Sequence, residues 1–110
     1  MDIETWMIQL RKGVAELILL RILKKGEAYG YAIRQQLSQT KVLALGESTV
    51  YPLLNRQTQE GYLSVRIVPS PDGPSRRYYR LTPQGYNRLK IMETYWNTLT
   101  EAVKELNIDS

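Results

Sequence analysis

The chain has 110 residues, the size of one domain, and its composition already excludes several kinds of site. It contains no Cys and no His. Disulfides, thiolate nucleophiles and Ser-His-Asp triads are therefore excluded, and we expect no enzyme activity, no metal site and no cofactor. The formal net charge of +4 indicates an anionic partner.

Nothing in the sequence indicates a membrane partner. The longest apolar run, residues 17–20, is far shorter than the roughly 18 to 20 residues that a membrane span needs. Asp2 and Glu4 stand where a signal peptide would be basic. We therefore expect a cytoplasmic protein.

Apolar residues at helical spacing predict two helices, over residues 5–25 and 30–38. The first helix carries apolar residues on more than one side, so we expect it to be buried on more than one side. Gly26 stands where a C-cap is expected. In the shorter second helix, Ile33 and Leu37 are predicted to face the core.

A third helix is predicted to begin after Ser48, whose hydroxyl can accept an N–H bond from the first turn. Pro52 fits this start, because the first four helical N–H groups have no helical acceptor. Val50 and Leu53 are predicted to face the core. Gly61 is expected to end the helix.

The next segment has the pattern of a β-hairpin. Residues 63–68 alternate as in a half-buried strand, and residues 69–75 consist of turn-forming residue types. Residues 76–81 are predicted to form the second strand, with Tyr79 and Leu81 on one face. We therefore expect a hairpin with a long tip.

Thr82 and Pro83 predict the start of a last helix, which runs to about Leu106. Three helices, a hairpin and one more helix are the elements of a winged helix-turn-helix. The predicted fold is therefore mainly α with a small β-hairpin. Residues 1–82 are expected to form the DNA-binding domain, and residues 83–110 a C-terminal dimerisation helix.

The last helix carries an apolar stripe with alternating steps of three and four residues, as in a coiled-coil seam. Such a stripe predicts a homodimer, in which the first helix also packs against the partner. The alternative is that the helix packs only on its own domain. The candidate interface residues are Leu89, Met92, Trp96, Leu99, Val103 and Leu106.

Aromatic and Met residues at both ends of the chain suggest a ligand cavity. If the first and last helices meet across the dimer, these side chains would surround a flat apolar space for a planar aromatic molecule. A plain hydrophobic interface explains the same residues. The candidate ligand-binding residues are Trp6, Met7, Met92, Tyr95 and Trp96.

The start of the third helix is the predicted base-contacting segment, because N-terminal residues of such a helix reach base edges in the major groove. Asn can bond adenine and Arg guanine in bidentate fashion, although either can equally contact phosphate or only solvent. The candidate residues of this helix are Ser48, Thr49, Tyr51, Asn55 and Arg56. Tyr29 and Tyr31 are candidate contacts to the DNA backbone, with buried core tyrosine as the alternative.

Arginines dominate the charge of the predicted hairpin. The segment contains four arginines and a single acidic residue, Asp72, and the arginines are Arg66, Arg76, Arg77 and Arg80. Guanidinium groups pair with phosphate through a planar fork, so the hairpin is predicted to bind the DNA backbone. A solvated charged hairpin is the alternative. The candidate wing contacts are Arg76, Arg77 and Tyr79.

Three segments carry a resemblance to a known family. Residues 29–33 (YGYAI), residues 48–56 (STVYPLLNR) and residues 73–82 (GPSRRYYRLT) resemble the PadR family of bacterial transcriptional regulators, in particular its short members. The sequence departs from the family at Gln57 and Thr58, where a Leu-Glu pair is usual. Gln57 falls on the predicted buried face, where its amide needs partners.

The resemblance implies a homodimeric winged-helix repressor that binds double-stranded DNA at pseudo-palindromic operators, often near its own gene or genes for detoxification and efflux. Some short members are relieved by planar aromatic or phenolic compounds held at the dimer centre, and Trp96 matches a stacking Trp of such proteins. An alternative from the residues alone is a protein-interaction module that uses its basic face on an acidic partner. Discrimination between an operator and scrambled DNA separates the two.

Overall fold

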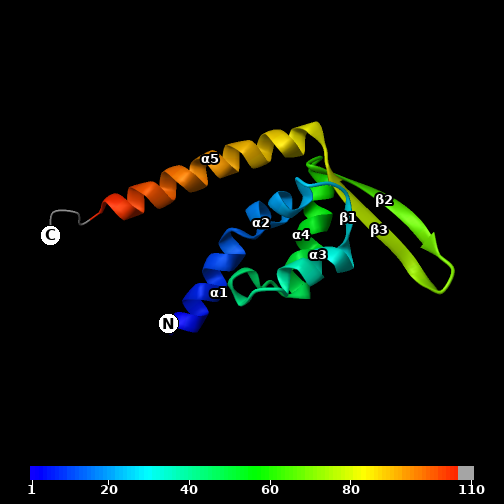
Figure 1. Cartoon of the computed structure of the whole chain (residues 1–110), viewed down its shortest axis with the longest axis horizontal. Helices are drawn as coiled ribbons and strands as arrows, with labels where there is room; N and C mark the ends of the chain where they lie inside the picture. The colour runs from blue at the N-terminus through cyan, green and yellow to red at the C-terminus, as the bar shows by residue number, and fades with distance from the viewer. Residues whose placement is uncertain (107–110) are drawn as a thin grey trace.

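The computed structural model describes residues 1–106 as five α-helices, one 3-10 turn and a three-stranded sheet (Figure 1). The helices are α1 (Ile3–Gly13), α2 (Ala15–Leu23), α3 (Gly30–Leu37), α4 (Glu47–Gln59) and α5 (Pro83–Glu105), with the 3-10 turn η1 (Lys41–Leu43) before α4. The strands are β1 (Ala28–Tyr29), β2 (Leu63–Ser70) and β3 (Gly73–Leu81). Within residues 1–106, none of the helices is long and apolar enough to cross a membrane.

The segment predicted as one helix over residues 5–25 is two helices, α1 and α2, joined at Val14. The Val14 N–H group bonds the carbonyls of both Leu10, at 3.1 Å, and Arg11, at 3.2 Å, and the backbone leaves helical geometry there. None of the α1 residues is buried, whereas α2 buries Leu19, Leu20 and other residues. The prediction of a single helix was wrong because the apolar spacing continues through the bend.

The start of α4 also differs from the prediction. Gly46 is the N-cap residue, and its carbonyl accepts the N–H groups of Thr49 and Val50, both at 3.0 Å. Ser48 therefore lies inside the first turn and does not cap the helix. Pro52 lies more than one turn into α4, so the Ser48 carbonyl lacks its usual helical donor.

The helix α4 ends at Gln59, and Gly61 terminates it, as predicted. Gly61 has a φ of 88°, which favours glycine, and its N–H group bonds the Thr58 carbonyl at 3.1 Å. The Tyr62 N–H group bonds the Gln57 carbonyl at 2.9 Å. These two bonds form a Schellman motif, which turns the chain directly into β2.

The sheet has the strand order β1-β3-β2, with both pairings antiparallel. The sequence pattern predicted only β2 and β3 and missed β1. The predicted long tip was also wrong, because Ser70 pairs with Gly73 and only residues 71–72 form the turn. Between Val68 and Ser70 the register shifts, as at a β-bulge.

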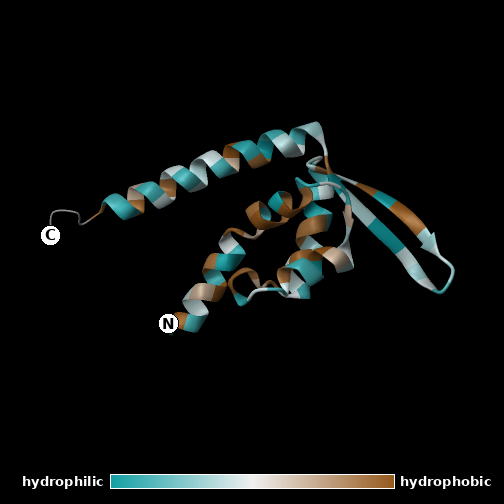
Figure 2. Cartoon of the chain, viewed as in Figure 1, coloured by the Kyte–Doolittle hydropathy of each residue, from teal (hydrophilic) through white to brown (hydrophobic). Residues whose placement is uncertain are grey.

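One apolar core lies where α2, α3, α4 and the inner face of the sheet meet the first turns of α5. Its buried members are Ala15, Leu19, Leu20, Leu23, Ile33, Leu37, Val50, Leu53, Leu54, Leu63, Tyr79, Leu81 and Leu89. Beyond this core, α5 continues away from the hairpin, and apolar residues recur along α1 and α5 outside it (Figure 2). The chain is thus a winged helix-turn-helix with a long C-terminal helix, as predicted.

Candidate nucleic-acid interface

The exposed face of α4 carries most of the side chains predicted to contact bases. Ser48, Asn55 and Arg56 are exposed, and Thr49 and Tyr51 are partly exposed. The opposite face is buried in the core. Arg56 forms an exposed ion pair with Glu60, four residues later, at 3.4 Å. The polar groups of α4 are thus available to a partner along one side of the helix.

An ion pair that the sequence pattern did not predict joins the start of α4 to α3. Arg34 of α3 donates to the carboxylate of Glu47, the first residue of α4, at 2.5 Å. It joins the two helices of the helix-turn-helix at their exposed side. No spacing in the sequence indicates this contact, because the connection that brings the two residues together is irregular.

A groove of about 670 Å³ lies between the start of α3, Tyr51 of α4 and the outer half of the hairpin. It brings together six of the residues predicted to contact DNA, which are Tyr29, Tyr31, Tyr51, Arg76, Arg77 and Tyr79. Gly30 allows this approach, since a Cβ there would lie 2.9 Å from the Tyr51 ring. The remaining four candidates, all on α4, do not line this groove.

The phenol groups in the groove differ in how accessible they are to a binding partner. Tyr31 is 54% exposed, and its hydroxyl accepts a hydrogen bond from Gln35 at 3.1 Å, which leaves the hydroxyl hydrogen free to donate. Tyr79 was predicted as a wing contact, but its side chain is only 4% exposed and packs in the core. Burial raises the pKa of the Tyr79 phenol. That prediction was wrong because Tyr79 lies on the inner face of β3, where the hairpin packs against the helices.

Arg76 and Arg77 point to opposite faces of β3, because successive side chains of a strand alternate. Arg77 shares the inner face with Tyr79, and its charge lowers the pKa of that phenol, against the larger effect of burial. Arg76 lies on the outer face, with its guanidinium carbon 5.0 Å from the centre of the Tyr29 ring. Within residues 1–106, neither arginine has a carboxylate within 4.0 Å.

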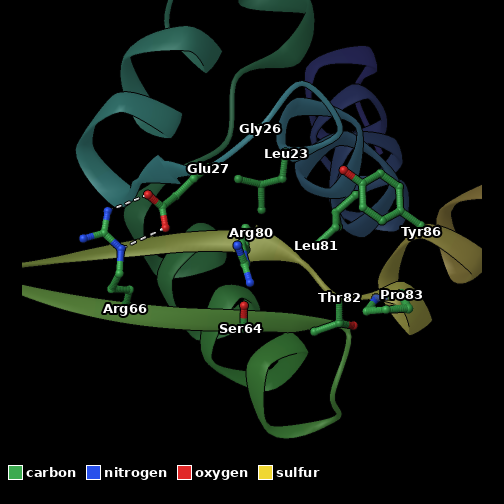
Figure 3. A pocket seen from close by; sticks show the side chains of 10 residues that line it. All are labelled: Leu23, Gly26, Glu27, Ser64, Arg66, Arg80, Leu81, Thr82, Pro83 and Tyr86. Atoms are coloured by element: carbon green, nitrogen blue, oxygen red, sulfur yellow. Dashed lines mark hydrogen bonds and ion pairs between the residues drawn. The ribbon is translucent and has the colours of Figure 1, made fainter.

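A second hollow lies at the base of the wing, on the outer face of the sheet (Figure 3). Arg66 donates to both carboxylate oxygens of Glu27, at 2.6 and 3.2 Å. These bonds lower the pKa of the Glu27 carboxyl below its ordinary value. Arg80 lies beside this pair, and Tyr86 forms the opposite wall.

The residues predicted at a dimer interface fall into two groups. Leu89 is buried in the chain's own core and packs inside the domain, so it cannot contribute an exposed interface side chain. Leu99, Val103 and Leu106 are exposed, and Met92 and Trp96 are partly exposed.

The predicted ligand-binding residues are only partly brought together within one chain. An apolar groove of about 460 Å³ lies between α1, α2 and α5, and Met92, Tyr95 and Trp96 line it. Trp6 lies instead at a separate hollow at the start of α1. Met7 is exposed on α1 and does not line the groove.

These features define a class of protein. A helix with an exposed polar face beside a basic two-stranded wing, with a groove of phenol and guanidinium groups between them, is the arrangement of winged-helix proteins that bind DNA. The phenols and arginines suit phosphate oxygens, and the α4 side chains suit base edges.

Comparison with known proteins shows the family. Residues 19–91 match the model of the transcriptional regulator PadR-like family. The chain is similar to the structure of a PadR-like transcription factor from Bacteroides fragilis, with 39% identity, a TM-score of 0.77, and coverage of 89% of this chain and 94% of that one. A PadR family transcriptional regulator from Eggerthella lenta has 28% identity and a TM-score of 0.88, with coverage of 98% and 94%. A PadR-like transcriptional regulator from Bacillus cereus has 30% identity and a TM-score of 0.78, with coverage of 93% and 99%.

This chain belongs to the PadR-like family of transcriptional regulators. It is therefore a DNA-binding regulator and not an enzyme.

Proposed function

We propose that this protein is a repressor that binds a pseudo-palindromic operator as a homodimer, with α4 in the major groove and the wing on the adjacent phosphates. The observation that carries the proposal is the groove that Tyr31, Tyr51 and Arg77 line together. Hydroxyl donors and a guanidinium fork around one space are the groups that bind a phosphate oxygen.

In this proposal, α4 supplies the base contacts. Ser48 and Thr49 lie in its first turn, and Asn55 and Arg56 lie on its exposed side farther along. Asn55 suits adenine and Arg56 suits guanine, each by paired hydrogen bonds. Arg56 can leave Glu60 at little cost, since an exposed pair contributes at most about 1 kcal/mol.

The dimer is proposed to form through α1 and the outer part of α5. Residues 1–82 are the proposed DNA-binding domain, whose first helix also joins the dimer, and residues 83–110 are the proposed dimerisation helix, of which residues 107–110 lie outside the described residues. The exposed apolar residues of α1 include Ile3, Trp6 and Leu10, and those of α5 include Leu99 and Val103. A helix that contacts only water does not carry an apolar face of this kind. In a two-fold symmetric dimer, the apolar faces of α1 and α5 would be covered by the same two helices of the partner.

The groove beside Trp96 supports a planar aromatic effector as part of the proposal. Met92, Tyr95 and Trp96 give it polarisable and aromatic walls, and Leu10 of α1 and Val14 at the junction of α1 and α2 line its other side. A partner subunit that brings Trp6 and Met7 to this groove would enclose it further. Because a regulator of transcription works on the chromosome, we place the protein in the bacterial cytoplasm, with detoxification or efflux genes as its proposed targets.

The test is a gel-shift titration with DNA from upstream of the protein's own gene, at fixed near-physiological salt and with scrambled DNA as competitor. We expect a discrete complex that survives a large excess of scrambled DNA. The same complex then serves to test 2-naphthol, a planar phenol, as a releasing compound. Equal binding to scrambled DNA would mean either that the operator lies elsewhere or that the basic face serves another partner, and selection from a random DNA pool separates these two outcomes.

The variant Asn55→Ala tests the proposed base contacts directly. It should cost about 1 to 3 kcal/mol at one position of each half-site and relax the preference for that base, because a bidentate contact to adenine is lost. Asn97→Ala, the same change on α5, is the matched control and should bind as the wild type does. A uniform loss over all sequences would instead assign Asn55 to phosphate.

A further inference from the structure

The outer face of the sheet carries a row of side chains from all three strands. Tyr29 of β1 pairs with Tyr78 of β3, and Tyr78 pairs with Arg66 of β2, so these three side chains lie next to one another. Two further residues extend the row, Glu27 before β1 and Arg76 on β3. We call these five residues the outer-face row.

Aromatic and ionic contacts join every member of the row to the next. The Arg76 guanidinium carbon lies 5.0 Å from the centre of the Tyr29 ring, and the Tyr29 and Tyr78 ring centres are 5.4 Å apart. The Arg66 guanidinium carbon lies 5.0 Å from the Tyr78 ring centre, and Arg66 also holds Glu27 through two hydrogen bonds. Both arginines are within the distance at which a cation is attracted to an aromatic face.

The row lies at the place where the wing is attached to the helix-turn-helix. The strand β1 has only two residues, so two register pairs join it to β3. Tyr29 is the last residue of β1 and the N-cap of α3. Besides the core contacts of Tyr79 and Leu81, the way in which Tyr29 is held against β3 therefore contributes to the orientation of the wing relative to α3.

We propose that Arg76 is a positioning residue, which holds the wing through the Tyr29 ring at the angle at which Arg77 meets the DNA backbone. In this assignment Arg76 and Tyr29 do not themselves bind phosphate. The inference rests on the proposed binding of the wing to DNA. It divides two adjacent arginines of equal charge between two functions. Both line the groove, but the Arg76 guanidinium is held over the Tyr29 ring, whereas within residues 1–106 no aromatic ring or carboxylate holds Arg77.

Salt dependence separates the two functions. Each phosphate contact that a variant loses lowers the slope of log K against log salt by about 0.9 in double-stranded DNA. We therefore propose to measure the affinity of Arg76→Gln and Arg77→Gln for the upstream DNA over a series of KCl concentrations. Arg77→Gln should lower the slope by about 0.9, whereas Arg76→Gln should weaken binding about two- to fivefold at every salt concentration with an unchanged slope.

Substitutions of Tyr29 test the same contact from the other side. Tyr29→Phe keeps the ring and removes the hydroxyl, so it should bind DNA as the wild type does. Tyr29→Leu removes the ring and should match Arg76→Gln. The double variant with both Arg76→Gln and Tyr29→Leu should be no weaker than either single variant, because both remove one contact.

Each outcome decides a separate point. An equal drop in slope for Arg76→Gln and Arg77→Gln would overturn the proposal, since Arg76 would then contact phosphate itself. A loss with Tyr29→Phe as large as with Tyr29→Leu would assign the hydroxyl to DNA and would also overturn it. An unchanged slope for Arg77→Gln would instead reject the proposed wing contact. If Tyr29→Leu fails to fold by circular dichroism, Tyr29→Phe and Arg76→Gln still decide the question.

Discussion

Gln57 is the single buried polar side chain of the core within residues 1–106, and neither its amide oxygen nor its amide nitrogen has a hydrogen-bond partner there. An unsatisfied buried polar group costs about 1 to 3 kcal/mol, and replacement by an apolar group of similar shape removes that cost. The sequence placed Gln57 on the buried face correctly, because helical spacing from Val50 and Leu53 decides it. Whether the amide finds partners depends on neighbours from other elements, and spacing does not give these.

We predict that Gln57→Leu stabilises the protein. The expected gain in the free energy of unfolding is about 1 to 3 kcal/mol, measured by urea denaturation. Gln59→Leu, the same change at an exposed position two residues later, is the control and should be near neutral. A loss of stability in Gln57→Leu, with Gln59→Leu near neutral, would contradict the predicted cost of the unsatisfied amide.

The start of α5 depends on a close approach between elements. A Cβ on Gly85 would lie 2.0 Å from the Tyr62 carbonyl oxygen, which also accepts the Thr82 N–H group at 3.1 Å. Thr82 caps α5 by accepting the Gly85 N–H group at 3.0 Å and donates to the Gly61 carbonyl at 2.6 Å. The first turn of α5 is thus fixed against the end of α4, and glycine is needed there for contact, not for its backbone angle.

Gly85→Ala should therefore move the first turn of α5 and destabilise the protein. Overpacking of this kind typically costs about 1 to 3 kcal/mol, and we expect the loss at the upper end, because a backbone oxygen cannot turn aside as a side chain can. Thermal unfolding followed by circular dichroism measures it. Gly13→Ala is the matched control, since a Cβ there meets no atom within 4 Å. Equal melting temperatures for the two variants would refute the predicted clash.

The elements that the sequence predicted correctly are those with a local signal. Helices α3 and α5 have periodic apolar faces, and α5 also begins at a Thr-Pro pair. In contrast, β1 is a two-residue strand that exists only because it pairs with β3, about fifty residues later in the chain. The stacking of Arg76 on Tyr29 depends on that pairing and was missed for the same reason. Alternation along β3 alone would have separated Arg76 from Arg77.

At the scale of the whole molecule, the exposed apolar stripe of α5 predicts self-association. Leu99→Glu combined with Val103→Glu places two charges in the stripe and should yield a monomer by sedimentation at concentrations where the wild type is a dimer. The variant should stay folded, because both residues are exposed in the single chain. Thr94→Glu with Asn97→Glu adds the same charge away from the stripe and should leave the dimer intact. A monomeric wild type would refute the proposed assembly.

The length of α5 beyond the core has a mechanical consequence. The residues from Lys90 to Glu105 continue the helix past Leu89, a distance of about 24 Å at 1.5 Å per residue. Over such an arm, a tilt of about 8° at Leu89 displaces the far end by about 3.4 Å, the rise of one base pair. If the proposed dimer holds the far end of α5 in place, the same tilt would instead move the domain that carries α4 by about the rise of one base pair.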